Sequence, residues 1–318
     1  MKRILTTAAL VALGAVSAFA KNDALSLIPN DAVTVGVVRV GELRTSPLSL
    51  ILFQHTDKMS SNGEGDRFLT DAGLDVKKDV DVLVVSTAPV TTLGSEAKVL
   101  VAADGRFNIE RLTNALVARG AVKKTTAHGA YFVLPESKEH DRGHGDGAVA
   151  FPDSHLALLG SESAVVEALA DRAAGGTTFG TASGLGREMV RIDTKATAWA
   201  LVDVVRAKRL GSAATHSNHD NFNAALKNVS TIAVWATDTG DSLKIGAFGL
   251  SHDAETLQLV EDTVRGALSM LRLAAQEKSP EMVSLLRRFN VSRNEESVTV
   301  SGTVPADSLK TFAAKQMK

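Results

Sequence analysis

Residues 33–40 read VTVGVVRV, a stretch dominated by β-branched side chains. Such stretches are typical of buried β-strands, because branched side chains pack well on a pleated surface. The turn residues Asn30 and Asp31 precede the stretch. A second stretch of the same character, TAWALVDV at 197–204, stands at the corresponding place in the second half of the chain. We expect both to form strands, and the rest of the fold is predicted outward from them.

In the first half, the pattern predicts helices and strands in turn. A helix is expected to start at Ser46-Pro47, because proline suits the first helical position, and Asn108 is expected to cap a later helix that Gly120 closes. The other predicted elements are a short helix at 66–72 that stops at Gly73, strands at 80–87 and 97–103, short strands around Val122 and at 131–134, 148–151 and 155–159, and a helix after Ser161-Glu-Ser163.

The second half repeats this order, which indicates a duplication. Strands are predicted at 229–236, 243–250 and 297–301, with a longer helix from about Asp253 and a last helix near Ala306. The domain limits that follow are a signal peptide at 1–20, a first repeat at 21–172, a linker with a short helix at 173–194, and a second repeat at 195–318.

The fold class is predicted as α+β, with two tandem similar domains. The hairpin-like strand pairs favour a mainly antiparallel sheet in each domain, with helices packed on one face. The two domains could also join edge to edge into one continuous sheet. That arrangement would protect strand edges and leave a concave face for a partner.

The first twenty residues, MKRILTTAALVALGAVSAFA, have the pattern of an export signal. Lys2 and Arg3 supply the positive end, an apolar run follows, and Ala18-Phe19-Ala20 is the small-x-small pattern that signal peptidase cuts. The apolar run is shorter than the roughly 20 residues of a membrane-spanning helix. We therefore expect cleavage after Ala20 and a soluble, periplasmic or secreted mature chain without stable membrane insertion.

Composition narrows the function classes. Loss of Lys2 and Arg3 leaves 33 basic against 36 acidic residues, a formal charge of −3, and that balance argues against a nucleic-acid partner. The chain has no cysteine, so disulfides, thiolate metal sites, cysteine nucleophiles and a lipobox cysteine for acyl anchoring are excluded.

The candidate metal site is the loop Glu136-Ser-Lys-Glu-His140-Asp-Arg-Gly-His144-Gly-Asp146. Imidazole nitrogens and carboxylate oxygens can hold zinc or another first-row metal, so His140 and His144 are the candidate ligands. A third ligand such as His128 or His155 would be needed. The alternative is a solvated hairpin loop, since nothing in this glycine-rich segment fixes the ligand geometry.

Other candidate residues have structural interpretations that the pattern favours. The cluster His216-Ser-Asn-His219-Asp220 lies in a second polar stretch. Ser161 is better explained as a helix cap than as a nucleophile, Asp79 and Asp81 as a solvated strand edge, and Trp199 and Trp235 as core residues rather than a stacking platform. We expect no catalytic residue and no cofactor from these patterns.

Several motifs together resemble a group of exported two-repeat α+β proteins of Gram-negative bacteria. These are the export signal, Leu27-Ile-Pro29 before the first strand, Leu43-Arg-Thr-Ser-Pro47 after it, Gly105-Arg-Phe107 before one helix and Gly160 before another. The resemblance covers most of the mature chain. Function in that group is unassigned, so the resemblance supports the fold and transfers no active residue.

The sequence therefore favours a non-enzymatic binding or interaction module of the bacterial envelope, whose partner is an envelope protein or a small ligand. The alternative is a metal- or small-ligand-dependent enzyme that uses the loop around His140 and His144.

Overall fold

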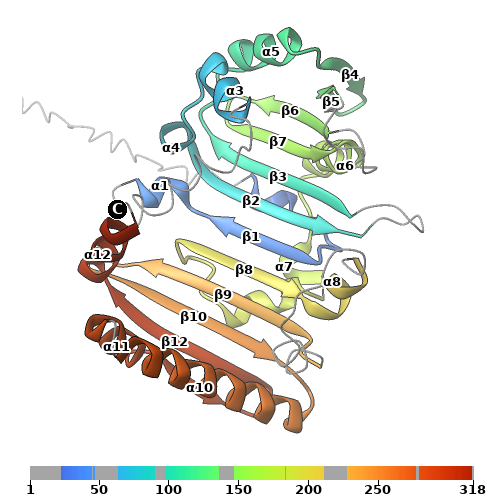
Figure 1. Ribbon diagram of the computed structural model, residues 1–318. Coiled ribbons are helices and arrows are strands. Elements are labelled where there is room, and N and C mark those ends of the chain that lie inside the picture. The colour runs from blue at the N-terminus through green and yellow to red at the C-terminus, as the bar shows by residue number, and fades with distance from the viewer. Residues whose placement is uncertain are drawn as a thin grey trace, which may run out of the picture.

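The stretch at 33–40 supplies the central strand of the molecule. In a computed structural model, β1 (Thr34–Val38) lies in the middle of a 12-stranded sheet that runs through both halves of the chain (Figure 1). The structure describes residues 23–44, 46, 64–89, 97–135, 147–182, 184–210, 228–276 and 279–316. The predicted helix after Pro47 and the export signal lie outside these residues.

The strands follow the order β11-β12-β10-β9-β8-β1-β2-β3-β7-β6-β5-β4, and every neighbouring pair is antiparallel. The bounds of the other strands are β2 (Val80–Ala88), β3 (Lys98–Gly105), β4 (Val122–Thr126), β5 (Gly129–Val133), β6 (Gly147–Asp153), β7 (Leu156–Ser161), β8 (Ala198–Asp203), β9 (Thr231–Asp238), β10 (Ser242–Leu250), β11 (Asn290–Arg293) and β12 (Ser297–Pro305).

The helices of the described residues connect these strands and lie beside them. Their bounds are η1 (Leu25–Leu27), α1 (Val40–Leu43), α3 (Glu64–Ala72), α4 (Val76–Asp79), α5 (Ile109–Ala118), α6 (Glu162–Ala173), α7 (Phe179–Ala182), η2 (Gly186–Arg191), α8 (Val204–Leu210), α10 (Ala254–Gln276), α11 (Pro280–Leu286) and α12 (Ala306–Gln316). Within this part of the chain, no helix has both the length and the apolar character needed to cross a bilayer.

Local sequence signals account for several helix ends. The Asn108 side chain accepts a hydrogen bond from the N–H of Arg111 at 3.1 Å and so caps α5. Gly73 follows α3 with a φ of +64°, a left-handed conformation that glycine adopts without steric cost. Ser279 caps α11 in the same way as Asn108, with Pro280 at the first helical position.

The α+β class and the antiparallel sheet are confirmed. From the centre outward, one half runs β1-β2-β3-β7-β6 and the other β8-β9-β10-β12-β11, while β5 and β4 extend the first half alone. The two halves join edge to edge through β1 and β8, and all five residues of β1 are matched to residues 198–202. The domain limits at 21–172, 173–194 and 195–318 stay a prediction.

The helices lie on both faces of the sheet, whereas the sequence analysis placed them on one. On one face, called the closed face here, Val84 packs in the main core with Leu169 of α6. On the other, called the open face, the preceding residue Leu83 packs with Leu112 of α5. Because β2 is apolar on both sides, each side needs a covering layer.

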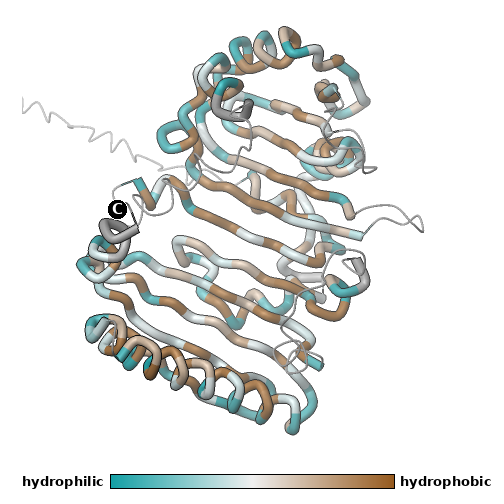
Figure 2. Tube along the Cα trace, viewed as in Figure 1, coloured by the Kyte–Doolittle hydropathy of each residue, from teal (hydrophilic) through white to brown (hydrophobic). Residues whose placement is uncertain are grey.

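The closed face is continuous across the joint between the halves. Leu27, Val37, Leu156, Trp199 and Phe248 belong to one buried cluster that η1, α6, α7 and η2 also contribute to. Figure 2 shows hydrophobic colours along the central strands on both sides of this joint. The core therefore does not divide at the predicted linker.

Two glycines, Gly36 of β1 and Gly105 of β3, give a matched test of the strand register. A methyl group on Gly105 would lie 2.1 Å from the Asp79 carbonyl oxygen, whereas one on Gly36 would have no neighbouring atom within 4 Å. We expect G105A to lower the free energy of unfolding by about 1–3 kcal/mol. G36A should raise it by about 0.5–1 kcal/mol, because alanine has less backbone freedom to lose. Urea unfolding followed by circular dichroism measures both, and equal effects would contradict the assigned register.

Candidate functional site

The predicted metal loop cannot be located here, because His140 and His144 lie outside the described residues, as do His216 and His219. The structure does place the two suggested third ligands. His128 lies in the exposed turn between β4 and β5, and the ring Nδ1 of His155 is 3.2 Å from the Gly105 carbonyl oxygen. Among the residues that the structure describes, no three His, Asp or Glu side chains gather to hold a metal ion.

Ser161, Asp79 and Asp81 have structural roles. The roles expected for Ser161 and Asp81 need correction. Ser161 stands at the N-cap of α6, but its hydroxyl caps no N–H of the helix and instead accepts from the N–H of Val99 at 3.3 Å. Asp81 is not merely solvated, since its carboxylate accepts a hydrogen bond from Arg44 Nη2 at 2.6 Å. The side-chain carboxylate of Asp79 accepts the N–H of Asp75 at 2.8 Å.

The open face carries a row of apolar residues that follows the strand register. Gly36 of β1 is matched to Val85 of β2 on one side and to Ala200 of β8 on the other. Matched residues in antiparallel strands point to the same face. The complete row, one residue from each strand between β12 and β7, is Val300, Ala247, Val234, Ala200, Gly36, Val85, Val101 and Leu159. We call it the apolar row.

The apolar row is partly exposed to solvent on β9, on β2 and at its β7 end. Val85, Val234 and Leu159 are 38%, 46% and 45% exposed. Beside them on the open face lies Val99, 39% exposed and matched to Thr87. Spanning seven strand spacings, the row is roughly 34 Å long at about 4.8 Å per spacing. A contiguous exposed patch of this kind on a sheet is typical of an interaction surface.

Helices border the apolar row at both ends. At the β12 end, Val300 packs against the cluster that contains Leu257 and Val260 of α10. Beyond Leu159, Val149 packs against the cluster that contains Leu116 of α5. In Figure 1, α10 and α3/α5 lie at opposite ends of the sheet. Helices also pack on the open face beside the row, since Leu83 of β2 belongs to the cluster that contains Ala72 of α3. Within the row, Val85 and Val234 stay partly exposed.

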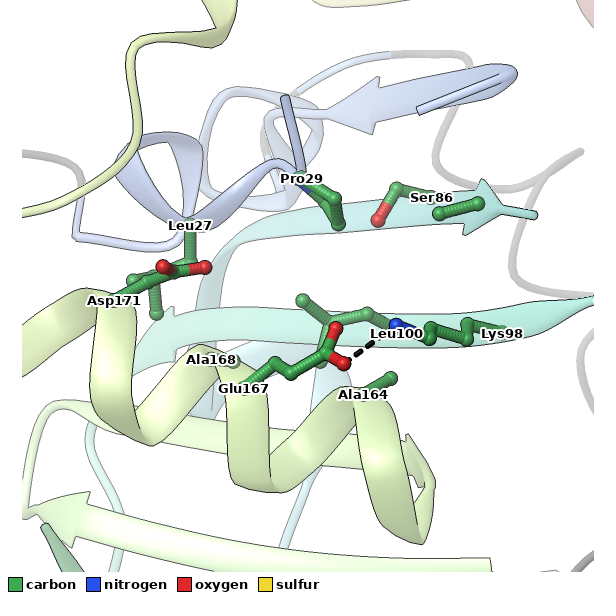
Figure 3. Close-up of a pocket in the computed structure, with 10 residues that line it drawn as sticks. Leu27, Pro29, Ser86, Lys98, Leu100, Ala164, Glu167, Ala168 and Asp171 are labelled. Atoms are coloured by element: carbon green, nitrogen blue, oxygen red, sulfur yellow. Dashed lines mark hydrogen bonds and ion pairs between the residues drawn. The ribbon is translucent and has the colours of Figure 1, made fainter. Parts of the chain in front are cut away.

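A small pocket on the closed face contains a buried hydroxyl. Ser86 is 1% exposed and its Oγ has no hydrogen-bond partner among the described residues, while Lys98 Nζ at the rim lies 2.5 Å from Glu167 Oε1 (Figure 3). Burial, followed by the negative charges of Glu167 and Asp31, raises the pKa of the Asp171 carboxyl at the same pocket. The cavity volume is about 20 Å³, which admits one water-sized group rather than a substrate.

A second buried polar group lies where the chain enters the fold. Asp104 Oδ1 of β3 accepts the N–H of Ala24 at 3.0 Å, and Asp104 Oδ2 is buried without a partner in the described structure. Burial, with a smaller contribution from the negative charges of neighbouring aspartates such as Asp23, raises the pKa of Asp104 to about 6. Asp104 therefore ties η1 to the sheet at the cost of holding a carboxylate out of water.

Comparison with known proteins supports the fold alone. No protein-family model and no curated protein matches the chain. Among solved structures, the chain is similar to crystal form III of TP0453, with a TM-score of 0.52 and 12% identity over 91% of this chain and 97% of that chain. Crystal form IV of TP0453 gives a TM-score of 0.49 and 11% identity over 94% and 98% of the two chains.

The raised pKa of Asp104 predicts a pH effect on stability. The folded protein holds this proton up to about pH 6, whereas the unfolded chain releases it near pH 4. Folded molecules bind the extra proton between these values, so the contribution of Asp104 to stability falls as pH rises from about 4 to about 6. D104N keeps an oxygen acceptor for Ala24 without the titration. The free energy of unfolding of the wild type, relative to D104N, should therefore decline across that window.

Urea unfolding at pH 4, 5, 6 and 7.5 tests this expectation. D241N, in the exposed turn between β9 and β10, is the control substitution. A constant difference between wild type and D104N at all four values would show that Asp104 titrates alike in both states.

Proposed function

We propose that this chain is an exported, non-enzymatic binding module of the bacterial envelope, and that the open face receives an apolar surface of another envelope component. Export rests on the signal pattern at 1–20, and with cleavage after Ala20 it places the mature chain in the periplasm or outside the cell. The observation that carries the binding role is the partly exposed apolar row, centred on Gly36 and Val85.

Physical chemistry supports this use of the apolar row. Each exposed valine or leucine leaves apolar area in water, and covering such area contributes about 25 cal/mol per Å². The side chains of the row are small or branched, so they project little from the sheet and have few rotamers. Such a flat, rigid surface fits an elongated apolar partner. The bordering helices α5 and α10 restrict the approach to the direction between them.

The rigid strands that carry the apolar row also lower the conformational entropy lost on binding. Val85 and Val234 sit on strands that are hydrogen-bonded on both sides, so their backbones are already fixed. A preformed surface loses less conformational freedom on association than a loop does. The open face is therefore suited to recognition without a conformational change of its own.

Site-specific photocrosslinking in the producing cells tests this proposal. A photoreactive amino acid at position 85 or 234 should give the same discrete adduct, because both positions lie on the apolar row. The matched control is position 190, where the native valine is 86% exposed but belongs to η2 on the closed side. The adducts are resolved by mass, and a mass of two chains would identify a second copy as the partner.

Three results separate the proposal from its rivals. A discrete adduct at 85 and 234 that is absent at 190 supports it. No adduct at any position, or the same adducts at all three, would contradict it. Replacing His140 and His144 together by alanine should leave the adduct unchanged, whereas its loss would favour the role that the sequence analysis gave to that loop.

A further inference from the structure

The exposed apolar side chains of the molecule are concentrated on two surfaces. Among the residues that the structure describes, twelve large hydrophobic side chains are exposed, and eight of them lie on α10 or on the open face of the sheet. These eight are Leu259, Met270, Leu271 and Leu273 of α10 and Val85, Val99, Leu159 and Val234 of the sheet. One helix and one sheet face therefore hold most of the apolar surface that a partner could cover.

The exposed apolar side of α10 points away from the sheet. Leu257 and Val260 of this helix pack in the cluster that covers the open face near β12. Leu259, Met270 and Leu273 follow one another at spacings of eleven and three residues, which place them together on the other side of the helix. We call these three residues the α10 stripe; Met270 and Leu273 are 73% and 70% exposed. Because α10 lies on the open face, its stripe faces the same side of the molecule as the apolar row.

The part of the open face between the bordering helices carries no charged side chain at its central positions. Three matched positions on each of β9, β8, β1, β2 and β3 form this surface, which we call the uncharged floor. They are Thr34, Gly36, Val38, Leu83, Val85, Thr87, Val99, Val101, Ala103, Ala198, Ala200, Val202, Ile232, Val234 and Ala236. The two threonine hydroxyls are hydrogen-bonded to each other at 2.6 Å. Such a floor offers an occupant apolar contact rather than ion pairs, as the α10 stripe does.

The dimensions of the uncharged floor match those of a helix. Val234 of β9 and Val85 of β2 are three strand spacings apart, about 14 Å. An α-helix with its side chains is about 10–12 Å wide. The 23 residues of α10 extend for about 35 Å, and the nine residues of β2 for about 30 Å. A helix the size of α10 therefore fits along the strands between the bordering helices.

The area of a stable dimer requires that both surfaces take part. A helix face about 35 Å long and 10 Å wide covers roughly 350 Å². Two copies of α10 packed only against each other would bury roughly 700 Å² in total, which is below the size of a stable interface, and would leave the floor exposed. If α10 of each copy lies on the floor of the other, the contact occurs twice and buries roughly 1,400 Å², within the standard range.

We propose that the partner of the open face is a second copy of this chain, in a two-fold dimer in which α10 of each copy lies on the uncharged floor of the other. A two-fold axis makes the two contacts identical, so one pair of complementary surfaces closes the assembly. This inference rests on the proposed function, because it takes the apolar row as the binding surface and adds the identity of the partner.

Sedimentation equilibrium of the mature chain at micromolar concentration tests the dimer, with a mass of two chains as the expected result. L273Q on the α10 stripe and V85Q on the floor should each raise the dimer Kd by at least about tenfold, because each substitution removes an apolar contact twice. V190Q is the matched control. It replaces an 86% exposed valine of η2 on the closed side, so its Kd should stay within about twofold of the wild-type value.

Crosslinking tests which surfaces meet, and the chain suits it because it has no cysteine. M270C and V234C are made as separate variants, and a short bismaleimide is added to each alone and to their mixture. The mixture should give a covalent dimer, because position 270 of one copy lies near position 234 of the other. Each variant alone should stay a single chain on a denaturing gel, because the thickness of a helix separates the two like positions.

Three results would overturn the dimer. The first is a mass of one chain throughout the micromolar range. The second is a dimer whose Kd is unchanged by both L273Q and V85Q. The third is crosslinking of M270C alone as complete as that of the mixture, which would place α10 against α10.

Failure of the dimer is distinguishable from failure of the proposed function. A mass of one chain in solution, together with a discrete adduct of another mass at positions 85 and 234 in cells, would overturn the dimer and support the proposed function. A two-chain mass that L273Q and V85Q abolish, together with the same adducts at 85, 234 and 190 in cells, would support the dimer and contradict the proposed function.

Discussion

The pairing of β1 with β8 is the interaction on which the rest of the structure depends. Each strand would otherwise be an edge of its own half, with a row of unpaired N–H and C=O groups. Their union turns two sheets into one and places Val37 beside Trp199 in a single buried cluster. The centre of the apolar row exists because these two strands meet.

The two faces of the sheet differ in how completely helices bury their residues. On the closed face, η1, α6, α7 and η2 bury the strand residues, including Leu156, Leu158 and Leu201, which are 0% exposed. On the open face, α5 and α10 cover the ends and leave Val85 and Val234 partly exposed. The covering is therefore unequal: one side of the sheet is buried and the other is partly exposed. The residues that form the main core are not the residues that stay exposed.

Local patterns predicted much of the secondary structure, because the signals are carried by neighbouring residues. The strand at 80–87 and the helix capped by Asn108 were both expected within a residue or two of their observed bounds. Long-range features were not predictable in this way. The apolar row depends on the register of strands far apart in sequence. Helix α11 was missed, although Ser279-Pro280 was a usable start signal. The apolar run Val82–Val85 was a usable sign that helices would cover both faces.

The central pairing also sets the order in which the fold can be completed. Thr34 is matched to Thr87 on one side and to Val202 on the other, so the second partner lies 168 residues further along the chain (202 minus 34). Contacts of such separation slow folding, because a long loop must close before they form. During synthesis, β1 can pair on one side only until residues 198–202 have been made. This interval is the stage at which a chaperone would protect the chain, or at which a strand from another molecule would compete for its free edge.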